Sequence, residues 1–146
     1  MVTLKTILLA EDNPKDIELT LEAFSENNLA NRLIVVRDGV EVLEYLRCEG
    51  QFKKRKRDLP AVLLLDIKMP RMDGIEVLEA IRNDNKLKAL PVVMLTSSRE
   101  EPDLKKCYAL GVNAYVVKPV NFKEFIDAAK HIGIFWAMLN EQPPQE

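Results

Sequence analysis

The sequence predicts an α/β fold with an open, doubly wound, five-stranded parallel sheet, and three observations lead to it. Five short apolar runs rich in leucine and β-branched residues recur along the 146 residues. Apolar and polar residues hardly alternate within them, as expected of strands buried on both faces. Segments with helical periodicity separate these runs. Residues typical of helix ends stand at the boundaries. The chain therefore reads as alternating strands and helices, (βα)5, in one domain.

The first two strand–helix units have clear helix starts. After the expected strand Ile7–Ala10, the pair Asn13-Pro14 supplies an N-cap followed by proline at the first helical position. After the expected strand Leu33–Val36, the pair Asp38-Gly39 opens a second helix. The apolar stripes of these helices lie opposite charged faces and are Ile17/Leu21/Phe24 and Val42/Leu43/Leu46.

The later units repeat this pattern, with expected strands at Ala61–Leu65, Val92–Leu95 and Ala114–Val117. Asp73-Gly74 opens the third helix and Gly111 ends the fourth. Right-handed crossovers between such strands give an open doubly wound sheet, in which ligands bind at the carboxyl ends of the strands. The helical stripes are Val77/Leu78/Ile81, Leu104/Cys107/Tyr108 and, after a cap at Asn121, Phe122/Phe125/Ile126/Ala129/Ile132.

Composition excludes several classes of protein. A net charge of −2, from 21 basic and 23 acidic residues, gives no overall field that favours nucleic acid or an anionic membrane. Two cysteines without CxxC spacing and a single histidine, His131, are too few for a zinc site. The N-terminus lacks the pattern of a secretion signal, and no apolar run approaches a membrane span. We therefore expect a cytoplasmic protein in a reducing compartment.

Polar side chains follow four of the expected strands. The strand ends carry Glu11-Asp12, Asp66, Thr96-Ser97-Ser98 and Lys118-Pro119, which the topology can bring to one place. Clustered carboxylates repel one another unless a cation is present, and Mg²⁺ prefers such oxygen ligands. A carboxylate can also act as the nucleophile towards phosphorus. Asp66, central in the expected sheet, is the candidate nucleophile, and Thr96 and Lys118 are candidate donors to phosphate oxygens.

These residues together resemble the receiver domain of two-component response regulators. The resemblance rests on Glu11-Asp12, Asp66-Ile-Lys-Met-Pro-x-Met-Asp-Gly74, Thr96-Ser-Ser, and Tyr115 with Lys118-Pro119, and it extends over residues 4–130. It implies the flavodoxin-like strand order 2-1-3-4-5. It also implies that the chain accepts a phosphoryl group from a sensor histidine kinase on Asp66, catalysing its own phosphorylation and dephosphorylation but not turning over as an enzyme.

The resemblance assigns a role to each matching residue. Mg²⁺, for which Mn²⁺ or Ca²⁺ can substitute, would be bound by Asp12, Asp66 and the main-chain carbonyl of Lys68, with Glu11 acting through a water. Thr96 and Lys118 would hold phosphoryl oxygens, and Tyr115 would turn inward as Thr96 moves. The family also implies a cis peptide before Pro119. The side chains of Lys68 and Ser98 stand at variable positions, and we hypothesise that they set the lifetime of the phosphorylated state.

Two other function classes are weaker. A Mg²⁺-dependent phosphatase with an aspartate nucleophile needs a second acid two residues later, where this chain has Lys68. A flavin-binding electron carrier needs a phosphate-cradling loop after the first strand, where Glu11-Asp12 would repel phosphate. No glycine-rich phosphate loop follows any expected strand, so a bound nucleotide is not indicated.

A run of five basic residues is a further local feature, and it consists of Lys53, Lys54, Arg55, Lys56 and Arg57. It is a candidate docking site for an acidic surface of the kinase, where its charges would mainly raise the association rate. A solvated loop is the simpler interpretation. Without interleaved aromatic residues, nucleic acid is the minority interpretation.

The last residues depart from an ordinary chain end. Residues 131–146 are expected to extend the last helix with an aromatic cluster, followed by a disordered end, and are too few for a DNA-binding domain. The apolar residues from Ile134 to Leu139 cover more of a helix than one sheet face can bury. We expect a homodimer through Phe122, Ile134, Phe135 and Trp136, and no contact with nucleic acid or membrane. The whole length, the basic loop and this tail more narrowly resemble the stand-alone receivers of cyanobacterial-phytochrome-type histidine kinases.

Overall fold

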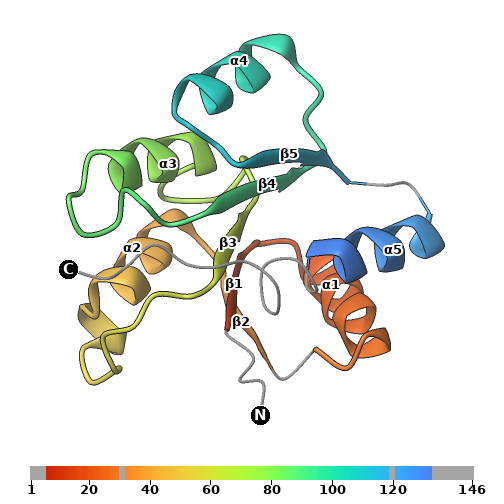
Figure 1. Ribbon diagram of the computed structural model, residues 1–146, viewed down its shortest axis with the longest axis horizontal. Helices are drawn as coiled ribbons and strands as arrows, with labels where there is room; N and C mark the ends of the chain where they lie inside the picture. Colours follow the sequence, from red (N-terminus) through yellow and green to blue (C-terminus); the bar gives the residue numbers. More distant parts are fainter. Residues whose placement is uncertain (1–5, 30–31, 119–120, 133–146) are drawn as a thin grey trace.

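Five parallel strands form the centre of the protein, and helices cover both faces of the sheet (Figure 1). The structure is a computed structural model, and it describes residues 6–29, 32–118 and 121–132. The strands are β1 (Ile7–Ala10), β2 (Leu33–Val36), β3 (Val62–Leu65), β4 (Val92–Thr96) and β5 (Ala114–Val117). Their order in the sheet is β2-β1-β3-β4-β5, which confirms the predicted strand order.

The helices alternate with the strands along the chain. They are α1 (Pro14–Glu26), α2 (Gly39–Arg47), α3 (Gly74–Arg82), α4 (Glu101–Ala109) and α5 (Phe122–Ile132), with a short 3₁₀ turn, η2 (Gly50–Phe52), after α2. Helices α1 and α5 lie side by side against one face of the sheet, and α2, α3 and α4 cover the other (Figure 1). Among the described residues, no helix has the length and apolar character that crossing a membrane requires.

The predicted helix starts are confirmed by the caps that form there. The Asn13 side chain accepts hydrogen bonds from the backbone N–H groups of Lys15 and Asp16, and proline follows it at the first helical position. Asp38 caps α2 through the N–H of Glu41, at 2.9 Å. Such caps satisfy N–H groups that have no partner inside the helix, so they fix where each helix begins. Asp73 and Glu76 form a reciprocal capping box at the start of α3.

Two apolar clusters, one on each face of the sheet, hold the layers together. Alternate strand residues point to opposite faces, so Leu8 and Leu63 pack with α2 and α3, while Leu9 and Leu64 pack with α1 and α5. Strands β1, β3 and β4 are buried throughout. The edge strands β2 and β5 are mostly half-buried, because each has a neighbouring strand on one side only. The burial predicted for both faces of every strand therefore applies fully to the three central strands.

Candidate functional site

The carboxyl ends of β1 and β3 bring the acidic residues together. Ala10 pairs with Leu65 at the last position of the two strands, so Glu11 and Asp12 emerge beside Asp66. The Asp66 N–H continues this ladder by donating to the Ala10 carbonyl at 3.1 Å. Carboxylate oxygens of Glu11, Asp12 and Asp66 all lie within 4.8 Å of one another. The predicted convergence of these residues is therefore present in the structure.

The ammonium group of Lys118 lies among these carboxylates. Its Nζ donates to Glu11, to Asp16 Oδ2 at 2.8 Å and to Asp66 Oδ2 at 3.2 Å. An ammonium group has three donors, so these three carboxylates use all of them. The Lys118 N–H donates to the Thr96 carbonyl at 2.8 Å, which holds the lysine at the end of β5 next to β4.

Asp16 is the site residue that sequence analysis misses. It lies in the first turn of α1, and its Oδ2 accepts a hydrogen bond from Lys118 Nζ at 2.8 Å, whereas the other two carboxylate partners of Lys118 follow strands β1 and β3. The available signal is its position three residues after the N-cap Asn13, which places it in the first helical turn, close to the carboxyl end of the first strand. That signal is weak, because an acidic residue in the first turn is also ordinary helix chemistry.

The electrostatics of the site follow from burial of these charges. The pKa of Glu11 is raised to about 7: burial raises it most, the hydrogen bond from Lys118 lowers it, and the charge of Asp66 raises it. Burial alone would lower the pKa of Lys118, but the hydrogen bonds to Asp16 and Glu11 and the charge of Asp66 outweigh it, and the net pKa is raised. The lysine is therefore held charged, and the pKa of Glu11 is raised because its carboxylate is buried beside that of Asp66.

The donors in the cleft are those that suit a small divalent cation. Mg²⁺ and Mn²⁺ prefer carboxylate, carbonyl and water oxygens, and two or three carboxylates per site are common. Asp12 is exposed to solvent, whereas Glu11 and Asp66 are buried, so an ion could enter from the Asp12 side. The rest of the cleft lining is largely polar and comprises Asn13, Pro14, Lys15, Asp16, Lys68, Ser97 and Lys118.

The segment after β4 carries Thr96 and is tied to its neighbours. Thr96 is 1% exposed, and its hydroxyl accepts the Ser98 N–H at 3.3 Å. The Tyr115 hydroxyl donates to the Ser98 carbonyl at 3.0 Å, and the Ser98 hydroxyl donates to Asp103 on α4 at 2.7 Å. Lys68 and Ser97, but not Ser98, are among the residues that line the cleft. The hypothesis that Lys68 and Ser98 set the lifetime of the phosphorylated state therefore has more geometric support for Lys68 than for Ser98.

The loop between β3 and α3 is held in place by close contacts. Asp66 Oδ1 accepts the Ile67 N–H at 2.8 Å, which orients the carboxylate. Gly74 packs so tightly that an added Cβ would lie 2.2 Å from the Asp66 carbonyl oxygen. Arg71, with a φ of 64°, forms two hydrogen bonds with Asp38 at 2.9 and 3.1 Å. Sequence analysis does not anticipate this last contact, which joins residues 33 positions apart.

In the basic run, Arg55 is half-buried and the other four residues are exposed. The Arg55 guanidinium lies 3.9 Å from the centroid of the Tyr45 ring and donates to the Tyr45 carbonyl and to Asp58. The exposed residues are Lys53, Lys54, Lys56 and Arg57. The run precedes β3, whereas Asp66 follows it, so the two lie at opposite ends of that strand.

Several predicted site residues lie outside the described part of the chain. These are Pro119, with its predicted cis bond, and Ile134, Phe135 and Trp136 of the predicted dimer contact. Phe122 begins α5, but its side chain is not among those described. The predictions for these positions stay predictions. The described apolar stripe of α5 is confirmed at Ala129 and Ile132, which are buried against the sheet.

Comparison with known proteins places these features in one family. The response regulator receiver domain family matches residues 7–130. The bacteriophytochrome response regulator RtBRR is 56% identical, with a TM-score of 0.78 over 97% of this chain and 86% of that one. The phosphorylated cyanobacterial phytochrome response regulator RcpA is 39% identical, with a TM-score of 0.87 over 97% of this chain and 100% of that one.

A third relative has been solved with a metal ion. The response regulator Rcp1 of Synechocystis is 37% identical over 132 residues, which are 90% of this chain and 88% of Rcp1. The crystal structure of its Mn²⁺-bound form has a TM-score of 0.85 over 96% of this chain and 99% of that one. The fold, the acidic cleft with its lysine and the family match agree: the chain belongs to the response regulator receiver domain family and is a response regulator homologous to those of phytochromes.

Proposed function

We propose that Asp66 accepts a phosphoryl group from a histidine of a sensor kinase. The observation that carries this proposal is the position of Asp66, at the base of an acidic cleft with Oδ2 3.2 Å from the Lys118 ammonium and Oδ1 held by the Ile67 N–H. A carboxylate fixed in this way is oriented for attack on phosphorus. The P–N bond of the phosphohistidine breaks as the bond from Asp66 to phosphorus forms, and the departing imidazole takes up a proton.

Each neighbouring residue has a proposed part in this transfer. Asp12, Asp66 and the main-chain carbonyl of Lys68 would hold Mg²⁺, with Glu11 acting through a water, and the ion would neutralise charge on the transferring group. The carboxylate cluster and the Mn²⁺-bound form of Rcp1 support this assignment. Lys118 would exchange one of its carboxylate contacts for a phosphoryl oxygen, which costs little because the ammonium stays paired throughout.

Thr96 and Tyr115 would report phosphorylation to the surface. Thr96 is buried at the end of β4 and would donate its hydroxyl to a phosphoryl oxygen. Ser98, two residues later, is bonded to both Tyr115 and Asp103, so a shift of Thr96 would strain these contacts first. We propose that release of Ser98 lets Tyr115 turn inward and changes the surface formed by α4 and β5, through which the protein signals.

We infer that the protein is not a turnover enzyme and catalyses only its own phosphorylation and dephosphorylation. The family match supports this, and the phosphatase alternative is not favoured. An aspartate-nucleophile phosphatase would need an acid two residues after Asp66, and the side chain there is the ammonium of Lys68.

We propose that the kinase is of the phytochrome type and that the protein acts in the cytoplasm. RtBRR and RcpA, named as bacteriophytochrome and phytochrome response regulators, support the first proposal at 56% and 39% identity. The free thiols of Cys48 and Cys107 support the second, since reducing compartments keep cysteines unpaired. Phosphotransfer from a purified phytochrome kinase, compared with a histidine kinase of another sensor class, tests the pairing. Equal transfer from both would contradict it.

We propose that residues 4–130 form the receiver domain and that the chain pairs as a homodimer through Phe122 and the extension at 131–146. The support is the run of apolar residues at Ile134, Phe135 and Trp136, which exceeds what one sheet face can bury. Light scattering on the intact chain and on the double variant Phe135→Ala/Trp136→Ala tests this. A monomeric intact chain would contradict it.

The central proposal is tested with acetyl phosphate in the presence and absence of Mg²⁺, followed by intact mass measurement. We expect the protein to gain the mass of one phosphoryl group only with Mg²⁺, and Asp66→Asn to gain none. Asp58→Asn is the matched control, because it makes the same change at an exposed carboxylate before β3, at the other end of that strand from Asp66. A mass gain that persists in Asp66→Asn, or that does not depend on metal, would refute the assignment.

A further inference from the structure

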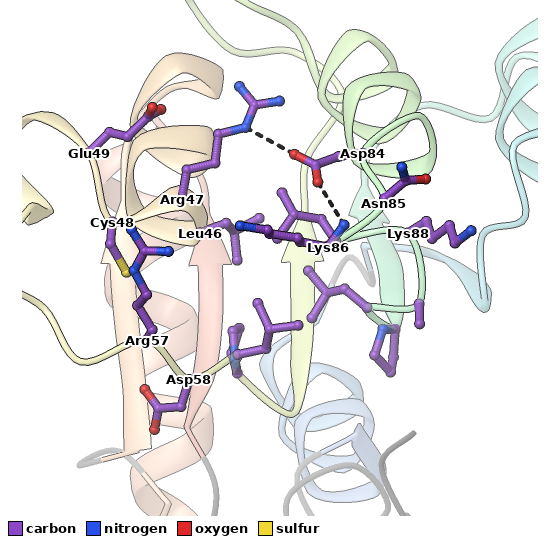
Figure 2. A pocket seen from close by; sticks show the side chains of 16 residues that line it. Leu46, Arg47, Cys48, Glu49, Arg57, Asp58, Asp84, Asn85, Lys86 and Lys88 are labelled. Atoms are coloured by element: carbon purple, nitrogen blue, oxygen red, sulfur yellow. Dashed lines mark hydrogen bonds and ion pairs between the residues drawn. The ribbon is translucent and has the colours of Figure 1, made fainter. Parts of the chain in front are cut away.

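A second cavity lies at the end of the sheet opposite Asp66. It has a volume of about 540 Å³ and lies between the end of α2, the start of β3 and the segment that joins α3 to β4 (Figure 2). Its apolar lining includes Leu46, Leu59, Leu87 and Leu90. Volumes of this size are typical of ligand sites with an apolar base and a few polar groups.

Two cations flank this cavity from different segments. Figure 2 shows Arg57, from the segment before β3, on one side of the space and Lys86, from the segment after α3, on the other. Within the described residues, neither side chain forms an ion pair, and both residues are exposed. The lining has three acidic residues: Asp84 pairs with Arg47 at 3.2 Å, Asp58 pairs with Arg55 at 3.3 Å, and Glu49 pairs with neither Arg57 nor Lys86. Arg57 and Lys86 are therefore available to an external anion.

Four further exposed cations accompany Arg57 and Lys86: Lys88 also lines the cavity, and Lys53, Lys54 and Lys56 belong to the same run as Arg57. We call the set Lys53, Lys54, Lys56, Arg57, Lys86 and Lys88 the basal patch. Its charge contrasts with the net charge of −2 of the whole chain and with the acidic cleft at the other end of the sheet. The four residues of β3 alone span about 13 Å between these two ends at roughly 3.3 Å per residue. The patch is thus separate from the phosphotransfer site.

We propose that the basal patch and its cavity bind an acidic peptide segment of a partner protein, with one apolar side chain of that segment in the cavity. Charge complementarity selects an acidic partner, and the leucine base of the cavity selects an apolar anchor. Three cations of the patch, Lys53, Lys54 and Lys56, lie outside the cavity lining, which suits an extended chain better than a small ligand. The site does not depend on the role proposed for Asp66, and a partner bound there would leave the acidic cleft open.

The aromatic residues of this region argue against nucleic acid. Single-stranded nucleic acid binds where exposed aromatic rings can stack on bases. The rings of Tyr45 and Phe52 instead pack edge-to-face with each other, with centroids 5.2 Å apart, and Arg55 covers the Tyr45 ring. They offer no stacking surface beside the patch.

Fluorescence anisotropy with a fluorescein-labelled peptide of glutamates around a central leucine tests the proposal. We expect binding that weakens steeply with added salt and several-fold when glycine replaces the central leucine. The double variant Arg57→Glu/Lys86→Glu should weaken binding roughly tenfold or more. The control Lys106→Glu/Lys123→Glu, which makes the same change of charge at exposed helix positions away from the patch, should bind like the wild type.

Three outcomes would overturn the proposal: no binding to the wild type at low salt, an equal loss in both double variants, or tighter binding of a labelled oligothymidine than of the peptide. Mass gain with acetyl phosphate and Mg²⁺ in Arg57→Glu/Lys86→Glu shows that this variant is folded. It also keeps a failure of the basal patch distinct from a failure of the phosphotransfer proposal.

Discussion

Asp16→Asn removes one of the three carboxylates that hold Lys118 while keeping the shape of the side chain. The Asp16 Oδ2 lies 2.8 Å from Nζ, in a pair whose side chains are 31% and 10% exposed. In a partly buried setting such a pair contributes about 1–2 kcal/mol net, because the asparagine oxygen still accepts a hydrogen bond and two carboxylates remain. That range corresponds to roughly a 5- to 30-fold change in an equilibrium constant.

The change should act in opposite directions on two ligands. With one negative charge fewer, the cleft should bind Mg²⁺ more weakly, by roughly 5-fold or more. Because a neutral amide holds the Lys118 ammonium less tightly than a carboxylate does, Lys118 should bind a phosphoryl group more readily. Beryllofluoride, a phosphoryl mimic, should therefore bind more tightly by a similar factor when the titration is done at saturating Mg²⁺. Isothermal titration calorimetry measures both constants.

A merely structural effect cannot produce this pattern, since a loosened cleft would weaken both ligands together. Glu18→Gln is the matched control, because Glu18 is an exposed carboxylate on the same helix outside the cleft lining. We expect it to leave both constants unchanged. Equal affinities in Asp16→Asn and the wild type, or a shift of both ligands in the same direction, would refute the role of Asp16 as a competing partner of Lys118.

Three further predictions concern the supports of the site and the core. Gly74→Ala should lower the free energy of unfolding by about 1–3 kcal/mol in urea denaturation, because its Cβ would meet the Asp66 carbonyl oxygen at 2.2 Å. Burial raises the pKa of the Cys107 thiol from 9.0 to about 11. The buried neutral thiol should therefore contribute to stability below pH 9, and this contribution should be lost as the pH rises from 9 to 11. Urea denaturation across this pH range should show the loss in the wild type and not in Cys107→Ala. Arg71→Ala should cost about 1 kcal/mol by loss of the pair with Asp38, and Arg71→Gly should cost less, since a φ of 64° suits glycine; thermal melts that rank the two the other way would contradict this.

The strands and the helix starts were predictable because their signals are local. The strands Ile7–Ala10, Leu33–Val36 and Ala114–Val117 have the predicted bounds, and the other two differ by one residue, at Val62 and at Thr96. A short run of apolar residues by itself indicates a buried strand, and each capping residue accepts hydrogen bonds from N–H groups only a few positions away. The convergence of Asp12, Asp66, Thr96 and Lys118 was predictable for a related reason, since a parallel sheet has only one carboxyl edge.

The contacts that sequence analysis missed join distant segments through long side chains. Lys118 reaches Asp16 across 102 positions, and Arg71 reaches Asp38 across 33. Neither pair follows from periodicity. A long charged side chain can reach several alternative partners, and which one it pairs with depends on the residues that the fold places around it. The orientation of Ser98 belongs to the same class, since its hydroxyl turns towards Asp103 instead of the cleft.

Electrostatics explains why this cleft would respond to phosphorylation only when a cation is bound. The cleft lining carries four carboxylates, those of Glu11, Asp12, Asp16 and Asp66, and three ammonium groups, those of Lys15, Lys68 and Lys118. A phosphoryl anion would therefore meet a net negative charge in the metal-free cleft. A divalent cation would remove that repulsion. It would also neutralise the carboxylates, so that they would attract the Lys118 ammonium group less strongly. The lysine can then transfer a donor to the phosphoryl group without leaving a buried carboxylate unpaired. In this arrangement Asp16 is the partner that Lys118 can release at least cost, because at 31% exposed its carboxylate can return to water, whereas those of Glu11 and Asp66 cannot.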